Sequence, residues 1–143
     1  MNPAIPLPVS HDASGVGVLL ITHHAIGSAL IEAARHVMPH LPLKMDVVEI
    51  GECADPAGTL SNTAHAARAL DGGGGVLVLS DLYGATPCNV AHKLGSLGVR
   101  ARCVSGLNLP MLLRVLNYAE KPLDELAEVA ASGGRGGIFI DKA

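Results

Sequence analysis

The fold of this 143-residue chain is decided by residues 16–27, which read VGVLLITHHAIG. Apolar residues fill five of the six positions from Val16 to Ile21, a pattern typical of a strand buried on both faces of a parallel sheet. The polar triplet Thr22-His23-His24 follows directly, and helical spacing begins at Ile26. Open α/β sheets carry their chemistry at the carboxyl ends of their strands. His23 therefore stands where a functional side chain is expected.

The composition excludes several classes of protein. Apolar residues make up 49% of the chain and charged residues 16%, yet no apolar run approaches the roughly 18–20 residues of a membrane helix. The chain is therefore not expected to be membrane-embedded. One Phe, two Tyr, no Trp and a formal charge of −3 argue against nucleic-acid binding. The three cysteines lack CxxC spacing, which favours reduced thiols in a cytoplasmic protein over a disulfide framework or a zinc site.

The amino terminus reads as a leader. Residues 1–14 contain three prolines but no basic region followed by an apolar one, so they do not form a signal peptide. We expect a flexible leader over residues 1–14 and a single domain over residues 15–143.

Strands and helices alternate along this domain. Strands are expected at residues 16–21, 45–50, 76–80, 99–104 and 138–140, and helices at 26–37, 56–70, 87–95, 108–116 and 122–130. This alternation predicts an α/β fold with right-handed crossovers and a doubly wound, mostly parallel sheet flanked by helices. The glycines at 72–75 close a helix and precede a strand, the reverse of a phosphate loop, so we interpret them as a connector. Those at 133–137 are expected to turn the chain into its last strand.

The switch point of strand order brings two loops together. The segments after the first and third strands, residues 22–24 and 81–86, are expected side by side there. Asp81 could then fix one ring nitrogen of His23 as N–H, while Thr86 caps the helix opened by Pro87 and turns its positive end toward the imidazole. This arrangement describes a phosphoryl acceptor. A packing histidine and a turn aspartate are the structural alternative.

Three motifs carry a resemblance to a known family. They are ITH at residues 21–23, DLYGATPCN at 81–89 and GLNLPML at 106–112. Together they make the chain resemble the mannose/fructose-type (mannose-fructose-sorbose family) IIA domains of the bacterial sugar phosphotransferase system. The resemblance runs from about residue 16 to residue 140.

The resemblance implies a phosphocarrier without metal or organic cofactor. Family members accept a phosphoryl group from the carrier HPr on a histidine, here His23, and pass it to a IIB partner. The aspartate that bonds the second ring nitrogen falls on Asp81 and the small hydroxyl residue on Thr86. Gly84 and Ala85 would let the phosphoryl group approach backbone amides, with Thr22 also at the phosphoryl site. The family's homodimers pair the C-terminal strand with the partner's sheet, which implies that residues 138–140 are exchanged here.

Several points stay open at this stage. We expect the domain to act on separate partners, and a regulatory relay is as compatible with the residues as sugar transport. A non-catalytic flavodoxin-like module that binds a nucleotide or another anion is the alternative function. We expect His24 to face solvent, Cys88 to serve packing and Tyr83 to form a wall of the pocket. Surface roles are expected for the remaining histidines, which are His36, His40, His65 and His92.

Overall fold

The computed structural model describes residues 14–142, so nearly all of the expected leader lies outside the described residues. Its centre is a sheet of strands β1 (Gly17–His23), β2 (Met45–Ile50), β3 (Val76–Ser80) and β4 (Ala101–Ser105). The strand order is β2-β1-β3-β4, and all three neighbouring pairs are parallel. Strand order switches between β1 and β3, as a doubly wound sheet requires. The predicted fold class is confirmed.

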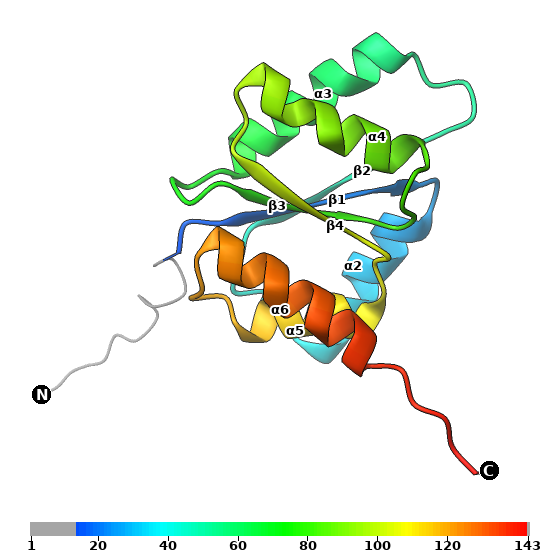
Figure 1. Ribbon diagram of the computed structural model, residues 1–143, viewed down its shortest axis with the longest axis vertical. Coiled ribbons are helices and arrows are strands. Elements are labelled where there is room, and N and C mark those ends of the chain that lie inside the picture. The colour runs from blue at the N-terminus through cyan, green and yellow to red at the C-terminus, as the bar shows by residue number, and fades with distance from the viewer. Residues whose placement is uncertain (1–13, 143) are drawn as a thin grey trace, which may run out of the picture.

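Helices cover both faces of the sheet (Figure 1). One face is covered by α2 (Ile26–Val37), α5 (Leu109–Asn117) and α6 (Leu123–Gly136). The other carries α3 (Pro56–Leu70), α4 (Thr86–Lys93) and the short 3₁₀ helix η1 (Leu94–Leu97). Each layer encloses its own apolar core against the sheet. Two cores on one sheet explain why β1 and β3 read as continuous apolar runs.

The alternation along β1 decides which way its last residues point. Val18 and Leu20 pack into the core beneath α2, α5 and α6, whereas Leu19 and Ile21 pack into the core beneath α3 and α4. All four are fully buried, and burial of each aliphatic side chain contributes about 1.5–3 kcal/mol. Successive side chains alternate between the faces of a strand. Thr22 therefore falls on the α2 side and His23 on the α4 side.

The C-terminal glycines do not form the predicted turn. Helix α6 continues through Gly136, and Gly133 and Gly134 are buried against α5. A Cβ at Gly133 would lie 2.5 Å from Cβ of Arg114, and one at Gly134 would lie 2.9 Å from Cε of Met111. Glycine is needed here because it lets α6 approach α5 closely. The prediction of a loop was wrong for this reason.

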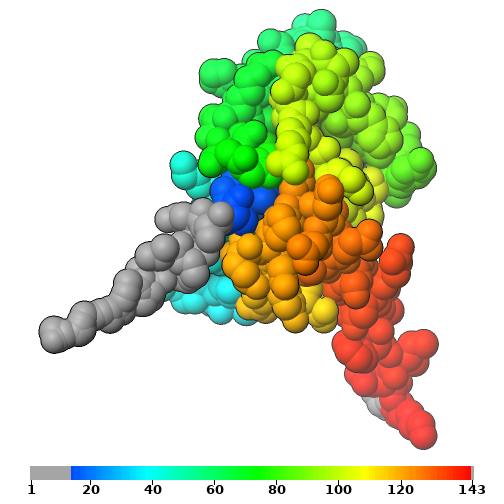
Figure 2. Space-filling model, turned by 60° about the vertical axis from the view of Figure 1, so that its left-hand side comes forward, coloured from blue at the N-terminus to red at the C-terminus, as the bar shows by residue number. Residues whose placement is uncertain are grey.

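The predicted last strand is not part of this chain's own sheet. Residues 138–140 have no regular structure, and Ile138, Phe139 and Ile140 are 72%, 81% and 97% exposed. Figure 2 shows this C-terminal segment projecting away from the body of the molecule. Exchange of the segment with a second copy stays a prediction.

The connector prediction for residues 72–75 agrees with the structure. These glycines join α3 to β3 at the amino-terminal edge of the sheet, opposite the edge that carries His23. Asp71 Oδ1 accepts hydrogen bonds from the N–H groups of Gly73 and Gly75, at 2.8 and 2.9 Å. The aspartate therefore closes the turn from within the chain.

Candidate functional site

His23 and Asp81 meet at the switch point of the sheet. Asp81 follows β3, and its Oδ2 lies 2.8 Å from Nδ1 of the His23 ring. The same oxygen accepts a hydrogen bond from the backbone N–H of His23 at 3.0 Å. One carboxylate oxygen therefore holds both the ring and the main chain of the histidine. The structure confirms that the two loops lie side by side.

The exposure of the two side chains differs sharply. The Asp81 side chain is 8% exposed, whereas that of His23 is 47% exposed. An ionised carboxylate can only accept hydrogen bonds, so Nδ1 carries the proton and Nε2 keeps its lone pair. The site thus combines a buried carboxylate with a half-exposed imidazole that the carboxylate holds through one ring nitrogen.

Thr22 lies beneath this pair rather than at the surface. It is fully buried, and its hydroxyl donates to the carbonyl oxygen of His23 at 2.8 Å. The Thr22 hydroxyl oxygen in turn accepts a hydrogen bond from the N–H of Gly27 at 2.9 Å, in the first turn of α2. These contacts favour a supporting role for Thr22, and direct phosphoryl contact by its side chain stays a prediction.

The turn between β1 and α2 contains an unusual backbone conformation. Ala25, the N-cap residue of α2, has φ 71° and is the only non-glycine residue with positive φ within residues 14–142. The left-handed conformation costs an L-residue about 1–2 kcal/mol. Such strain persists where surrounding contacts impose it. It lies two residues from His23.

Glu49 is a residue of this region that the sequence reasoning missed. Its side chain lies on the α2 side of β2, where Oε2 accepts a hydrogen bond from the N–H of Ser28 at 2.8 Å. Hydrogen bonds from the Ser28 side chain and N–H hold the pKa of Glu49 below its ordinary value, with smaller contributions from the Ala25 N–H and the His24 ring. A lone acidic residue in the apolar strand 45–50 was the available signal.

The loop after β3 leads into an uncapped helix. Gly84 adopts φ 82°, which glycine tolerates without strain, and Ala85 is the N-cap residue of α4. No side chain within residues 14–142 caps this helix. Thr86 is its exposed first residue, so the prediction that Thr86 caps α4 was wrong by one position. The positive end of α4 remains available beside the loop.

Three apolar side chains that are close to His23 or Asp81 in the sequence are exposed to solvent. Ile26, Leu82 and Tyr83 are 41%, 58% and 76% exposed, on the two segments that meet at the switch point. His24 is 84% exposed, as predicted, and its Nδ1 lies 3.8 Å from Oε1 of Glu49. The combination of exposed apolar residues and an exposed histidine suits contact with another protein.

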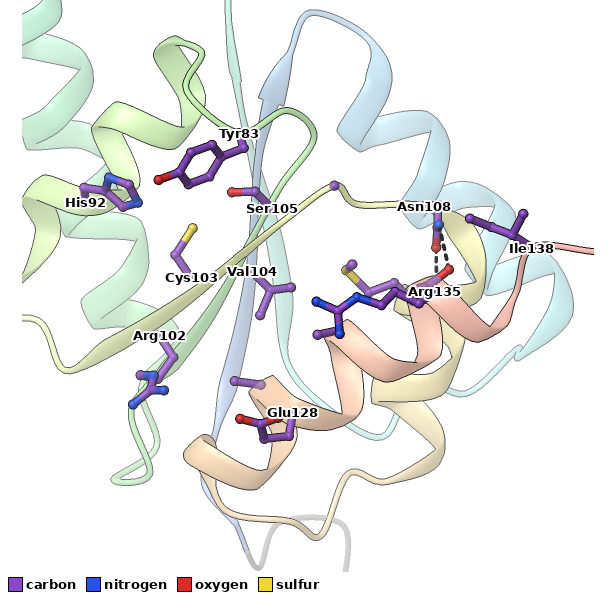
Figure 3. Close-up of a pocket in the computed structure, with 15 residues that line it drawn as sticks. Tyr83, His92, Arg102, Cys103, Val104, Ser105, Asn108, Glu128, Arg135 and Ile138 are labelled. Atoms are coloured by element: carbon purple, nitrogen blue, oxygen red, sulfur yellow. Dashed lines mark hydrogen bonds between the residues drawn. The ribbon is translucent and has the colours of Figure 1, made fainter.

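A groove of about 620 Å³ runs along β4 (Figure 3). Tyr83, His92, Cys103 and Ser105 line it on the α4 side, and Arg135 lines it from α6. Tyr83 thus forms a wall of this groove. Its ring packs edge to face against that of His92, with the two ring centroids 6.3 Å apart. Neither His23 nor Asp81 is among the lining residues.

Two cysteines belong to this region: Cys103 lines the groove, and Cys88 lies buried beside it. Cys88 is fully buried, as its predicted packing role requires, with Sγ 3.6 Å from Nε2 of His92 and 3.5 Å from Oγ of Ser105. Burial raises the pKa of Cys103 to about 11. The four histidines expected at the surface, His36, His40, His65 and His92, are all exposed, and His92 in addition contacts Cys88 and Tyr83.

Two broader features concern residues 14–142. None of their helices combines the length and apolar character needed to cross a membrane. Within the same range, no three His, Cys, Asp or Glu side chains are grouped as a metal site would need.

Comparison with known proteins gives the family. The model of the family described as PTS system fructose IIA component, where PTS is the phosphotransferase system, matches residues 17–131. A search of curated proteins finds no match.

Solved structures share the fold. The mannose/sorbose-specific IIA subunit of the phosphotransferase system from Enterococcus faecalis is 26% identical, with a TM-score of 0.77 over 89% of this chain and 95% of that one. The phosphotransferase component EIIA from Streptococcus agalactiae is 19% identical, with a TM-score of 0.75 over 87% and 96%. The PTS IIA protein associated with the fucose utilization operon of Streptococcus pneumoniae is 21% identical, with a TM-score of 0.70 over 88% and 93%. The family match over residues 17–131 shows that this chain belongs to the fructose IIA component family of the phosphotransferase system.

Proposed function

We propose that this protein is a phosphocarrier that accepts a phosphoryl group from phospho-HPr on Nε2 of His23. It then delivers the group to a IIB component or uses it as a regulatory signal. The observation that carries the proposal is the 2.8 Å contact between Nδ1 of His23 and Oδ2 of Asp81, which engages one nitrogen of a ring that is 47% exposed and leaves Nε2 to react. The exchange takes place in the cytoplasm, where HPr and the IIB component would be met.

The transfer step balances without a cofactor. The lone pair of Nε2 attacks phosphorus and forms a new N–P bond, while the N–P bond of the donor histidine breaks and its electron pair stays on the donor nitrogen. The Nδ1 proton remains on His23, so the ring becomes cationic as the new bond forms. Asp81 lies against that proton and stabilises the charge, as a buried aspartate does for other catalytic histidines.

The start of α4 supplies the second part of the site. The phosphoryl group carries its negative charge on three equatorial oxygens during transfer, and positioned N–H groups stabilise them. Backbone amides at residues 84–86 and the exposed Thr86 hydroxyl are the groups we assign to this task. The uncapped end of α4 supports the assignment.

The proposed dimer uses the C-terminal segment. The outer edge of β4 has no neighbouring strand within residues 14–142, and exposed edges of this kind pair readily with another chain. Residues 138–140 of a second copy would cover this edge and its groove. Deletion of residues 137–143 should then convert a dimer into a monomer, as light scattering can show. A full-length chain that is monomeric at micromolar concentration contradicts this assembly.

The function is tested by incubating the protein with phosphoenolpyruvate, enzyme I and HPr. We expect an acid-labile, base-stable label that His23→Ala abolishes and His24→Ala retains. The His23→Ala variant should stay folded because the exposed ring fills no core. Bound nucleotide without any label would instead support the anion-binding module.

A further inference from the structure

The first turn of α2 is held by two side chains from different strands. Thr22 of β1 and Glu49 of β2 are register partners, and both reach the N-terminus of this helix. Thr22 accepts the N–H of Gly27, and Glu49 accepts that of Ser28. The start of α2 is therefore held by one side chain from each of the two neighbouring strands, β1 and β2.

The tied segment contains the left-handed Ala25. This residue separates His24 from the first turn of α2 and reverses the chain within two residues of His23. Glu49 contacts residues on both sides of Ala25 in the sequence: Oε2 accepts the N–H of Ser28, three residues after Ala25, and Oε1 lies 3.8 Å from Nδ1 of His24, directly before it. Glu49 thus spans the strained turn, with a backbone contact after it and a side-chain contact before it.

We propose that Glu49 is a positioning residue for His23: its carboxylate keeps Ala25 left-handed and thereby fixes the backbone from which the His23 ring reaches Asp81. This inference rests on the proposed function for its kinetic consequence. Its structural consequence, the state of the His23–Asp81 hydrogen bond, is independent of phosphoryl transfer.

A carboxylate suits this place better than an amide. Oε2 of Glu49 accepts the Ser28 N–H while Oε1 faces the His24 ring at 3.8 Å, and the N–H groups at a helix start favour negative charge. A glutamine has one acceptor oxygen and would turn its NH₂ group toward another donor. Glu49→Gln therefore keeps the size of the side chain and removes the charge and one acceptor.

The kinetic test compares Glu49→Gln with Glu52→Gln. Glu52 is exposed just beyond β2, so the control makes the same change of charge near the same edge of the sheet. We expect Glu49→Gln to slow phosphorylation by HPr about tenfold, because small displacements of a reacting group are costly, with HPr affinity within about twofold of wild type. The control should transfer at the wild-type rate.

A second substitution separates positioning from general stability. Glycine adopts the left-handed conformation freely, so Ala25→Gly should restore the rate in the Glu49→Gln background. Nuclear magnetic resonance of the imidazole provides a readout without HPr: the Nδ1–H signal of His23 should weaken in Glu49→Gln and return in the double variant.

The outcomes distinguish this inference from the proposed function. A wild-type protein that takes no label refutes phosphoryl transfer, while the Nδ1–H signal still decides the role of Glu49. An unchanged His23 signal in Glu49→Gln, or a loss that Ala25→Gly fails to restore, overturns the inference. A lower melting temperature with an unchanged rate and signal assigns Glu49 to stability alone.

Discussion

Helices α2 and α4 begin at the same edge of the sheet, on opposite faces. Their first turns differ in whether side chains accept hydrogen bonds from the free N–H groups. The start of α2 is filled by the chain's own groups, the Thr22 hydroxyl and the Glu49 carboxylate. The start of α4 receives no side-chain cap within residues 14–142. An occupied helix start fixes a backbone, whereas an open one can attract an anion. Under the proposed function, the comparison assigns the orientation of His23 to α2 and leaves the start of α4 for the phosphoryl group.

The largest effect is expected from Asp81, which holds both the ring and the backbone N–H of His23. Asp81→Asn keeps the shape of the side chain that holds His23 but removes its charge. Loss of a preorganised electrostatic partner slows reactions by about 10²–10³. We expect transfer from HPr to slow by this factor in quench-flow experiments, with binding by calorimetry little changed because Asp81 is covered. A near-wild-type rate would make Asp81 a turn residue and remove the pairing from the mechanism.

Adding an N-cap side chain to α4 would make its first turn resemble that of α2, whose N–H groups are already bound by side chains. Ala85 has the extended backbone of an N-cap residue, so Ala85→Asp should cap the helix and raise the free energy of unfolding by about 1 kcal/mol. The new charge would stand where phosphoryl oxygens arrive, and we expect transfer to slow about tenfold or more. Ala85→Asn is the matched uncharged cap and should slow transfer less. Equal rates for wild type and Ala85→Asp would show that α4 takes no part.

The smallest effect concerns the pH dependence of stability at α2. The pKa of Glu49 is lowered in the folded protein from its ordinary value of 4.5, chiefly by hydrogen bonds from Ser28. Its contribution to stability is therefore present above that value and lost as the pH falls through the folded-state pKa. Urea unfolding between about pH 3 and pH 6 should show wild type and Glu49→Gln converging at the acidic end. A gap that does not depend on pH contradicts the assigned contacts.

The fold and the reacting pair could be predicted because local rules determine them. Alternating apolar strands and amphipathic helices give the doubly wound sheet, and the switch-point rule then places His23 beside Asp81. The starts of the helices expected at 56 and 108 lie within one residue of those of α3 and α5, where Asp55 and Asn108 each accept a hydrogen bond from the N–H three residues ahead.

The remaining features depend on distant contacts that sequence spacing does not reveal. Glu49 reaches α2 only because β2 pairs with β1 in one register. The glycines at 133 and 134 look like a loop until Arg114 and Met111 of α5 are placed against them. Residues 138–140 have the composition of a strand, but composition does not specify the sheet that receives them.

The central claim is that Asp81 reserves Nδ1 of His23 and leaves Nε2 to react. The most direct measurement is phosphorus and nitrogen magnetic resonance of the ¹⁵N-labelled protein, phosphorylated through enzyme I and HPr and kept alkaline. We predict a single phosphohistidine at His23 with phosphorus coupled to Nε2, and Nδ1 still protonated. A phosphoryl group on Nδ1 of His23, or on His24, would contradict the mechanism.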